Sequence, residues 1–235
     1  MKQQKFRRLT WIIVILVILS ALGGFIYHTS VFRPAQNFHV IDPGKFYRSA
    51  QLGKDEFDGI VAKYGIKTVI NLRGSQPGEW WFDDEKSALE RLHVRMENIG
   101  FSTEQMQTKE DWVSFIQLLR TAERPILVHC RSGADRTGEA SAVYMMDYMG
   151  TDRTTALEQL SLKYLHVSMF MPAKRLFVEN YQGADWLMNK YNPCDAPFRE
   201  YARSESHCPS TSAEKISAQP NMKTTGGLSS AVDKH

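Results

Sequence analysis

Short apolar runs alternate along this chain with stretches that have the apolar spacing of amphipathic helices. Residues 66–72 (IKTVINL), 94–99 (VRMENI) and 125–130 (PILVHC) have the length and composition of buried strands. Residues 79–92 and 108–123, between these runs, predict helices. Because strands that are joined through helices lie parallel, the sequence predicts an α/β fold with a central, mostly parallel sheet flanked by helices on both faces.

Further helices are predicted on either side of this core. One covers residues 55–65 and ends at its glycine, and three follow the last strand, over 136–149, 154–165 and 173–191. In open α/β sheets, ligands bind beyond the C-terminal ends of the strands. The residues that follow the run 125–130 are therefore the first place to look for a site.

The composition narrows the range of possible functions. The chain has 235 residues, 43% of them hydrophobic, which is enough for one domain of ordinary size with appendages. Its net charge is only +3 and no Lys/Arg-rich block with interleaved aromatics occurs, so we expect no nucleic-acid partner. Its three cysteines lie far apart without C-x2-C spacing, so we expect no metal site. Nothing in the sequence predicts an oligomeric state.

Residues 9–27 form an almost unbroken apolar run behind four basic residues within residues 1–8. As a helix this run would be about 30 Å long, enough to cross the hydrocarbon core of a bilayer. The basic residues favour a cytoplasmic N-terminus, with everything after the run on the other side of the membrane. The alternative is a cleaved signal peptide, for which the run is long and the small residues 21–23 make a weak cleavage site.

From residue 193 onward the chain is rich in Ser, Thr, Pro, Gly and isolated charges, a composition typical of disorder. The sequence therefore predicts five parts. The parts are a basic cytoplasmic N-terminus (1–8), a single transmembrane helix (9–27), a linker (28–37), one folded domain (38–191) and a polar, disordered tail (192–235).

The stretch HCRSGADRTG, residues 129–138, joins the last predicted strand to the helix that follows. A loop at a helix N-terminus can bind an anion, because backbone N–H groups point inward and the helix dipole adds positive charge. Gly133 permits the tight curvature, and Arg136 can donate two parallel hydrogen bonds to phosphate oxygens. The same field favours the thiolate of Cys130, which is the nucleophilic form.

These residues together predict attack on phosphorus and a phosphocysteine intermediate. Thr137 can donate a hydrogen bond to the sulfur, and the rest of the loop, Arg131, Ser132 and Ala134, would surround the substrate phosphate. The competing interpretation is an ordinary buried cysteine at the end of a core strand. The fit of the whole loop favours the nucleophile.

HCRSGADRTG resembles the H-C-x5-R-[ST]-G signature loop of the cysteine-dependent protein tyrosine and dual-specificity phosphatases. The DRTG ending is most similar to bacterial and atypical dual-specificity members. FYRSAQL and GIKTVINLR resemble the first strands of that group, and RPILVHC its central strand. The resemblance spans residues 38–191. It implies the compact phosphatase fold, no metal or organic cofactor, and Cys130 with Arg136 as the core catalytic pair. With the apolar run, it leads us to predict a bacterial inner-membrane protein with a periplasmic catalytic domain.

The general acid is the point at which the chain departs from that family. The dual-specificity enzymes carry an Asp on a mobile loop before the cysteine, whereas the stretch 96–105 (MENIGFSTEQ) has Asn98 near that position and no Asp. Asp135, inside the signature loop, is one candidate, because some bacterial members with a DRTG loop are thought to use it. Glu104, on the expected mobile loop, is the second candidate.

Each candidate has a structural alternative. Asp135 would otherwise cap the following helix or pair with Arg131, and Glu104 would be a solvated surface charge. Asp111 is a weaker third candidate, because it has capping-box spacing to Thr108.

Several other residues are predicted to support the site. His129 would orient the loop by hydrogen bonding. Arg73 and Arg48 either line the pocket mouth or form salt bridges at the sheet edge. The acidic residues 83–85 are expected in the exposed first turn of a helix, with a substrate-facing role as the alternative.

Cys194 and Cys208 are the remaining cysteines. If the domain lies outside the cytoplasm they can pair with each other and leave Cys130 free. Two unpaired tail cysteines are the alternative.

The main functional hypothesis is a membrane-anchored phosphatase that hydrolyses phosphomonoesters of proteins or small molecules, of the phosphotyrosine or dual-specificity type. Ala134 and Asp135 stand where basic residues are expected in loops that bind inositol phosphates, which favours a singly phosphorylated substrate. Phosphoinositides, inositol phosphates and glycan phosphates remain alternatives. A different class of function is a catalytically weak module that binds phosphorylated ligands.

Overall fold

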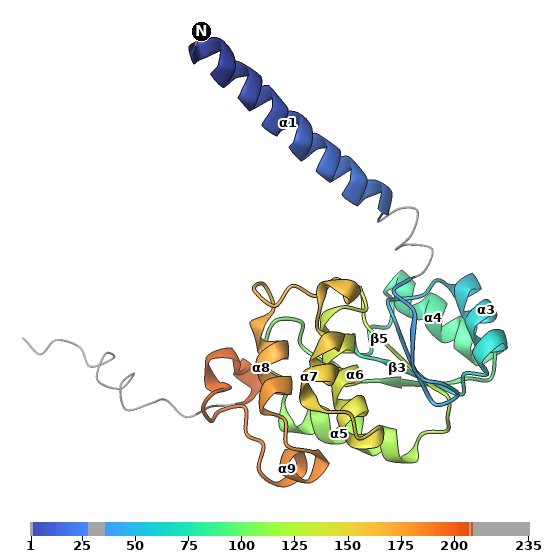
Figure 1. Cartoon of the computed structure of the whole chain (residues 1–235). Helices are drawn as coiled ribbons and strands as arrows, with labels where there is room; N and C mark the ends of the chain where they lie inside the picture. The colour runs from blue at the N-terminus through green and yellow to red at the C-terminus, as the bar shows by residue number, and fades with distance from the viewer. Residues whose placement is uncertain (1, 28–35, 207, 209–235) are drawn as a thin grey trace, which may run out of the picture.

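The structure is a computed structural model that describes residues 2–27, 36–206 and 208 (Figure 1). Its first element, α1 (Lys2–Tyr27), contains a 20-residue stretch, Arg7–Ile26, that is long and apolar enough to cross a membrane. None of this stretch is buried. A membrane-spanning helix and a signal sequence share these properties. The predicted linker lies outside the described residues except for its last two.

A five-stranded sheet forms the centre of the domain, with strand order β1-β2-β5-β3-β4. β1 pairs antiparallel with β2, and the other neighbours are parallel. The predicted mostly parallel sheet is therefore confirmed, with β5 at its centre. The strands are β1 (His39–Asp42), β2 (Phe46–Ser49), β3 (Thr68–Asn71), β4 (Arg95–Asn98) and β5 (Ile126–His129).

Helices cover both faces of the sheet (Figure 1). Alternate residues of a strand point to opposite faces of the sheet. Val128 therefore packs on the face covered by the helices that follow β4 in the chain, and Leu127 packs on the other face, which is covered by the two helices between β2 and β4. The helices are α3 (Lys54–Tyr64), α4 (Trp80–Arg91), α5 (Lys109–Thr121), α6 (Asp135–Tyr148), α7 (Arg153–Ala156), α8 (Pro172–Asn180) and α9 (Ala184–Asn189).

The last two predicted helices are interrupted. Residues 154–165 form α7 and two 3-10 turns, η2 (Leu157–Gln159) and η3 (Leu162–Tyr164), in part because Arg48 takes the Gln159 carbonyl as a partner. Residues 173–191 form α8 and α9, separated at Gly183, whose φ of +97° is incompatible with a continuous helix. In both cases the helical periodicity of the sequence extends over a segment that does not form one continuous helix.

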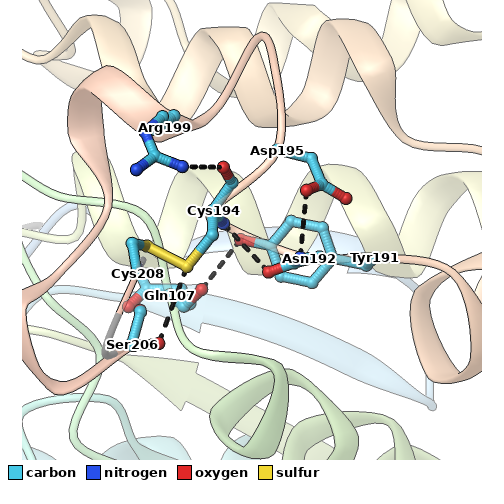
Figure 2. Close-up of a disulfide and its surroundings, with 8 residues drawn as sticks. All are labelled: Gln107, Tyr191, Asn192, Cys194, Asp195, Arg199, Ser206 and Cys208. Carbon is cyan, nitrogen blue, oxygen red and sulfur yellow. Dashed lines mark hydrogen bonds between the residues drawn. A yellow bond between two sulfur atoms is a disulfide. The ribbon is translucent and has the colours of Figure 1, made fainter. Parts of the chain in front are cut away.

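The prediction of a disordered tail is wrong for residues 192–206. Phe198 is buried in the main core, and Cys194 forms a disulfide with Cys208, as Figure 2 shows. The Tyr201 carbonyl accepts a hydrogen bond from the Met106 N–H at 2.8 Å. An aromatic anchor and a crosslink therefore fix a segment whose composition alone is typical of disorder. This segment includes η4 (Arg199–Tyr201) and η5 (Ser204–Ser206). The tail at 207 and 209–235 lies outside the described residues.

Candidate active site

β5 delivers Cys130 to the C-terminal edge of the sheet. All four residues of β5 are buried, and Cys130, directly after them, is 2% exposed. Residues 130–134 then turn into α6, which begins at Asp135. The predicted strand–loop–helix arrangement is confirmed, and with it the placement of the loop at a helix N-terminus.

Gly133 is the tightest point of this loop. Its φ is +69°, in the left-handed region. A Cβ at this position would lie 2.7 Å from the N atom of Ala50 and 2.7 Å from the carbonyl oxygen of Ser49. Glycine is required here both for its backbone conformation and for the close approach of β2.

Arg48 forms hydrogen bonds that hold the loop against the sheet. Its side chain is completely buried and donates hydrogen bonds to the Gly133 carbonyl and to the side chain and carbonyl of Gln159. Burial lowers the pKa of Arg48 from 12.5 to about 10, which leaves it charged at neutral pH. Because Arg48 is fully buried and forms no salt bridge with the described residues, neither of its predicted placements holds, and its hydrogen bonds connect it to the loop instead.

Arg136 reaches across the C-terminal ends of the strands. Its Nη1 donates to the carbonyls of Leu72 and Phe101, at 3.3 and 3.4 Å. Its Nε is buried without a hydrogen-bond partner among the described residues. A buried donor without a partner is costly, so this guanidinium is suited to an incoming anion.

Asp135 pairs with a residue that the sequence does not single out. Its Oδ1 lies 2.8 Å from Nδ1 of His166, whose side chain is fully buried. Neither expected alternative holds, because Ala134 occupies the cap position of α6 and no ion pair joins Asp135 to Arg131 in the described residues. Asp135 itself is 15% exposed, so it remains accessible.

The loop that carries Glu104 is held by buried polar groups. Gln107 bonds both to Ser102 and to the buried carboxylate of Glu139, and Lys174 donates to the Gln105 carbonyl at 2.6 Å. Glu104 itself is exposed. Figure 2 shows Tyr191, whose hydroxyl donates to the Gln107 carbonyl at 2.8 Å.

Asp111 has a structural role. It completes the capping box with Thr108 at the start of α5, and it accepts a bond from Arg203 at 2.9 Å. The favoured interpretation of this residue as a cap is confirmed.

The remaining loop residues differ in accessibility. Arg131 is exposed, whereas Ala134 is buried. The Ser132 carbonyl accepts a bond from Asn37 at 3.0 Å. The Thr137 hydroxyl has no hydrogen-bond partner among the described residues, so the expected bond from it to the Cys130 sulfur is absent.

His129 makes the hydrogen bond predicted for it, but to an unexpected partner. Its Nε2 lies 2.7 Å from Oε1 of Glu85, and both side chains are fully buried. Glu85 was expected in an exposed first turn. It is instead buried with Trp81 and Phe82 on the inner face of α4.

A groove of about 880 Å³ opens beside the loop. Arg131 from the loop and the half-buried Arg73 lie along it, and Trp80, 76% exposed, stands at its side. Burial, followed by the nearby charges of Arg136 and Arg131, lowers the pKa of Arg73 to about 10. Arg73 lies along this groove and donates to Gln51. Its placement at the mouth of the catalytic pocket stays a prediction.

The parallel sheet and the strand–loop–helix unit around Cys130 are the features by which the chain can be assigned to a family. Residues 53–191 match the family model for the dual specificity phosphatase catalytic domain, and the chain belongs to that family. It is 29% identical over 129 residues to the dual specificity protein phosphatase TpbA of Pseudomonas aeruginosa. That match covers 54% of each protein, so the chain spans about half the length of this curated relative.

Solved structures show the same fold. The crystal structure of P. aeruginosa TpbA matches with a TM-score of 0.53 and 23% identity, over 66% of this chain and 90% of that one. The core catalytic domain of the PP-IP phosphatase Siw14 from S. cerevisiae, in complex with citrate, matches with a TM-score of 0.53 and 19% identity. That alignment covers 63% of this chain and 87% of the other.

Proposed function

We propose that this chain hydrolyses phosphomonoesters of the phosphotyrosine or dual-specificity type through a phosphocysteine intermediate on Cys130. The observation that carries the proposal is the loop itself. It holds a buried cysteine at the end of the central strand and, six residues later, an arginine whose buried Nε has no hydrogen-bond partner in the part of the chain that the structure describes. The main-chain N–H groups of residues 131–134 and the Arg136 guanidinium would hold the three non-bridging phosphate oxygens.

The reaction then takes two displacements at phosphorus. In the first, the Cys130 thiolate forms an S–P bond while the P–O bond to the substrate breaks, and the leaving oxygen takes a proton from an acid. In the second, water attacks the phosphocysteine, and the same group, now a base, receives a proton from the water. The S–P bond breaks and inorganic phosphate leaves.

We assign the acid to Asp135, with Glu104 as the alternative. Asp135 is supported by its position next to Arg136 on the loop and by its partial exposure. The bond to His166 would orient its carboxyl group. Glu104 has the exposure that an acid needs, but the Gln107 and Lys174 contacts fasten its loop.

A singly phosphorylated substrate is favoured over a polyphosphate. The loop carries Asp135, and the adjoining groove is lined by four carboxylates and three cationic side chains. A dense polyanion would meet repulsion there. The similar TpbA structure in complex with pTyr supports the same choice, although the PP-IP phosphatase shares the fold.

We further propose that α1 anchors the enzyme in a bacterial inner membrane with the catalytic domain in the periplasm. The four basic residues before the apolar stretch support this orientation. The Cys194–Cys208 disulfide supports it independently, because such bonds persist outside the reducing cytoplasm.

Turnover of an aryl phosphate tests the proposal. The full chain in detergent should release phosphate from the aryl ester and from a phosphotyrosine peptide, and Cys130→Ser should release none. Absence of turnover in the wild-type protein, with phosphopeptide binding retained, would instead support a binding module. A strong preference for an inositol polyphosphate would contradict the assigned substrate class.

A further inference from the structure

Two residues contact the sequence neighbours of Cys130, Glu85 through its side chain and Gln51 through its backbone. Glu85 lies 2.7 Å from the His129 ring, on one side of the nucleophile. On the other side, the Gln51 backbone N–H donates to the Arg131 carbonyl at 3.3 Å. The Gln51 side-chain amide donates to Glu85 at 2.7 Å, so the two supports are joined.

The directions of the Arg73–Gln51 and Gln51–Glu85 hydrogen bonds follow from the donors and acceptors present. Nη1 of Arg73 can only donate, and it donates to Oε1 of Gln51 at 2.9 Å. The Gln51 amide must therefore direct its NH2 group at Glu85. Glu85 accepts at one oxygen from Gln51, and its other oxygen lies beside His129 Nε2. As an ionised carboxylate, Glu85 accepts there too, from the His129 tautomer that carries its proton on Nε2. A carboxylate can accept at both oxygens, whereas a glutamine amide can accept at only one.

The carboxylate of Glu85 is buried among apolar side chains. Glu85 is 1% exposed, and its neighbours on the inner face of α4 include the apolar Trp81, Ala88 and Leu89. Burying a carboxylate is unfavourable unless its oxygens are satisfied. Arg73, the last donor in this series of hydrogen bonds, also stacks on Trp81, with its guanidinium carbon 3.2 Å from the ring centroid.

We propose that Glu85 is a positioning residue for the phosphatase reaction. Its carboxylate contacts the His129 ring directly and holds the side chain of Gln51, the residue whose backbone N–H donates to the Arg131 carbonyl. Through these two contacts Glu85 sets the orientation of Cys130 and of the loop N–H groups. This inference rests on the proposed function of the loop. Glu85 does not touch the substrate.

The test exchanges the carboxylate and the amide between positions 85 and 51. In Glu85→Gln the amide cannot accept from both partners, so kcat for an aryl phosphate should fall on the order of 100-fold. The double variant Gln51→Glu/Glu85→Gln exchanges the two side chains. The carboxylate at position 51 then accepts from Arg73 and from the amide NH2 at position 85. The amide oxygen at position 85 accepts from His129. All bonds are restored, and kcat should recover at least about tenfold over the single variant.

Glu90→Gln is the matched control, because Glu90 lies on the exposed side of the same helix and pairs only with Lys86 at 3.9 Å in the described structure. Its kcat should stay within about twofold of wild type. The inference is overturned if Glu85→Gln matches this control, or if the folded double variant is no more active than the folded single variant.

Two further results keep the test decisive. If Glu85→Gln does not fold, Gln51→Ala takes its place, since it removes the side-chain bond to Glu85 but leaves Glu85 beside His129 and keeps the backbone N–H that donates to Arg131. It should lower kcat at least about tenfold with an unchanged melting temperature, and full activity would contradict the inference. An inactive wild-type protein would contradict the proposed function itself, a result distinct from an active wild type with equally active variants.

Discussion

The buried guanidinium of Arg48 donates a hydrogen bond to the carbonyl of Gly133, the residue at the tightest point of the candidate phosphate loop. Arg48 lies on β2, beside the central strand β5 that carries Cys130. The same guanidinium reaches Gln159 beyond α6. One side chain thus joins the sheet, the loop and the segment behind it, which makes the shape of the loop depend on a residue outside the signature.

Arg48→Lys should therefore damage both stability and activity. A single ammonium cannot reproduce the fork that serves Gly133 and Gln159 together. We expect the free energy of unfolding to fall by about 2 kcal/mol and kcat/KM to fall on the order of 100-fold. Urea unfolding and aryl phosphate turnover measure the two effects. Arg95→Lys, at an exposed arginine on β4, is the control, and equal behaviour of the two variants would contradict this role.

The identity of the general acid is tested with leaving groups of different basicity. Asp135→Asn should lower kcat by about 100-fold or more for a phenyl phosphate, whose leaving oxygen needs a proton. A nitrophenyl ester, which leaves as a stable anion, should lose much less.

Glu104→Gln is the matched comparison in the same assay. We expect it to leave both rates near the wild-type values. A selective loss in Glu104→Gln with none in Asp135→Asn would move the acid to the loop before α5. Equal losses for both esters in Asp135→Asn would remove Asp135 from this role.

The Cys194–Cys208 disulfide should contribute measurably to stability. It closes a separation of 14 residues and retains the segment that bonds to Met106 and Asp111. The double variant Cys194→Ser/Cys208→Ser should lose about 3 kcal/mol of unfolding free energy.

A reducing agent supplies the control. It should destabilise the wild-type protein to the level of the double variant and leave the double variant unchanged. A double variant as stable as the oxidised protein, or one that still responds to reductant, would show that the bridge does not hold this segment.

His39 should make the protein acid-sensitive. Burial, followed by the charges of Arg48 and Lys163, lowers the pKa of His39 from 6.5 to about 4. Between these values the unfolded chain binds a proton that the folded protein does not, so stability falls as the pH drops from 6.5 and the loss is complete near pH 4.

Unfolding free energies at pH 7.5 and pH 5 measure this effect. His39→Gln should lose less stability between the two conditions than the wild type does. His93→Asn, at an exposed histidine, should follow the wild type. The account of His39 is wrong if the two variants show the same pH dependence.

The sequence predicts β3, β4, β5, most of the helices and the loop, because these depend on local periodicity and on a dense motif. The pattern does not predict β1, and β2 is expected only from the family resemblance. β3, β5, α5 and the strand–loop–helix unit around Cys130 are found where the pattern predicts them. The partners of the site residues are not predictable in this way. Glu85 is 44 positions from His129, and His166 is 31 positions from Asp135.

The errors have the same physical origin. From the sequence, Glu85 is expected to be an exposed carboxylate on a helix, but it lies on the face of α4 that packs against the core. The segment 192–206 has the composition of a disordered tail, but Phe198 and the disulfide fix it to the core. In each case a long-range contact decides the structure, and a single sequence read locally carries no signal for it.

The most direct test of the central claim is mass spectrometry of the full chain, quenched with acid within the first turnover of an aryl phosphate. The account predicts a phosphoryl group on the peptide that contains Cys130, and no such group in Cys130→Ser. A phosphoryl group on a different residue, or turnover of the ester by Cys130→Ser, would contradict it.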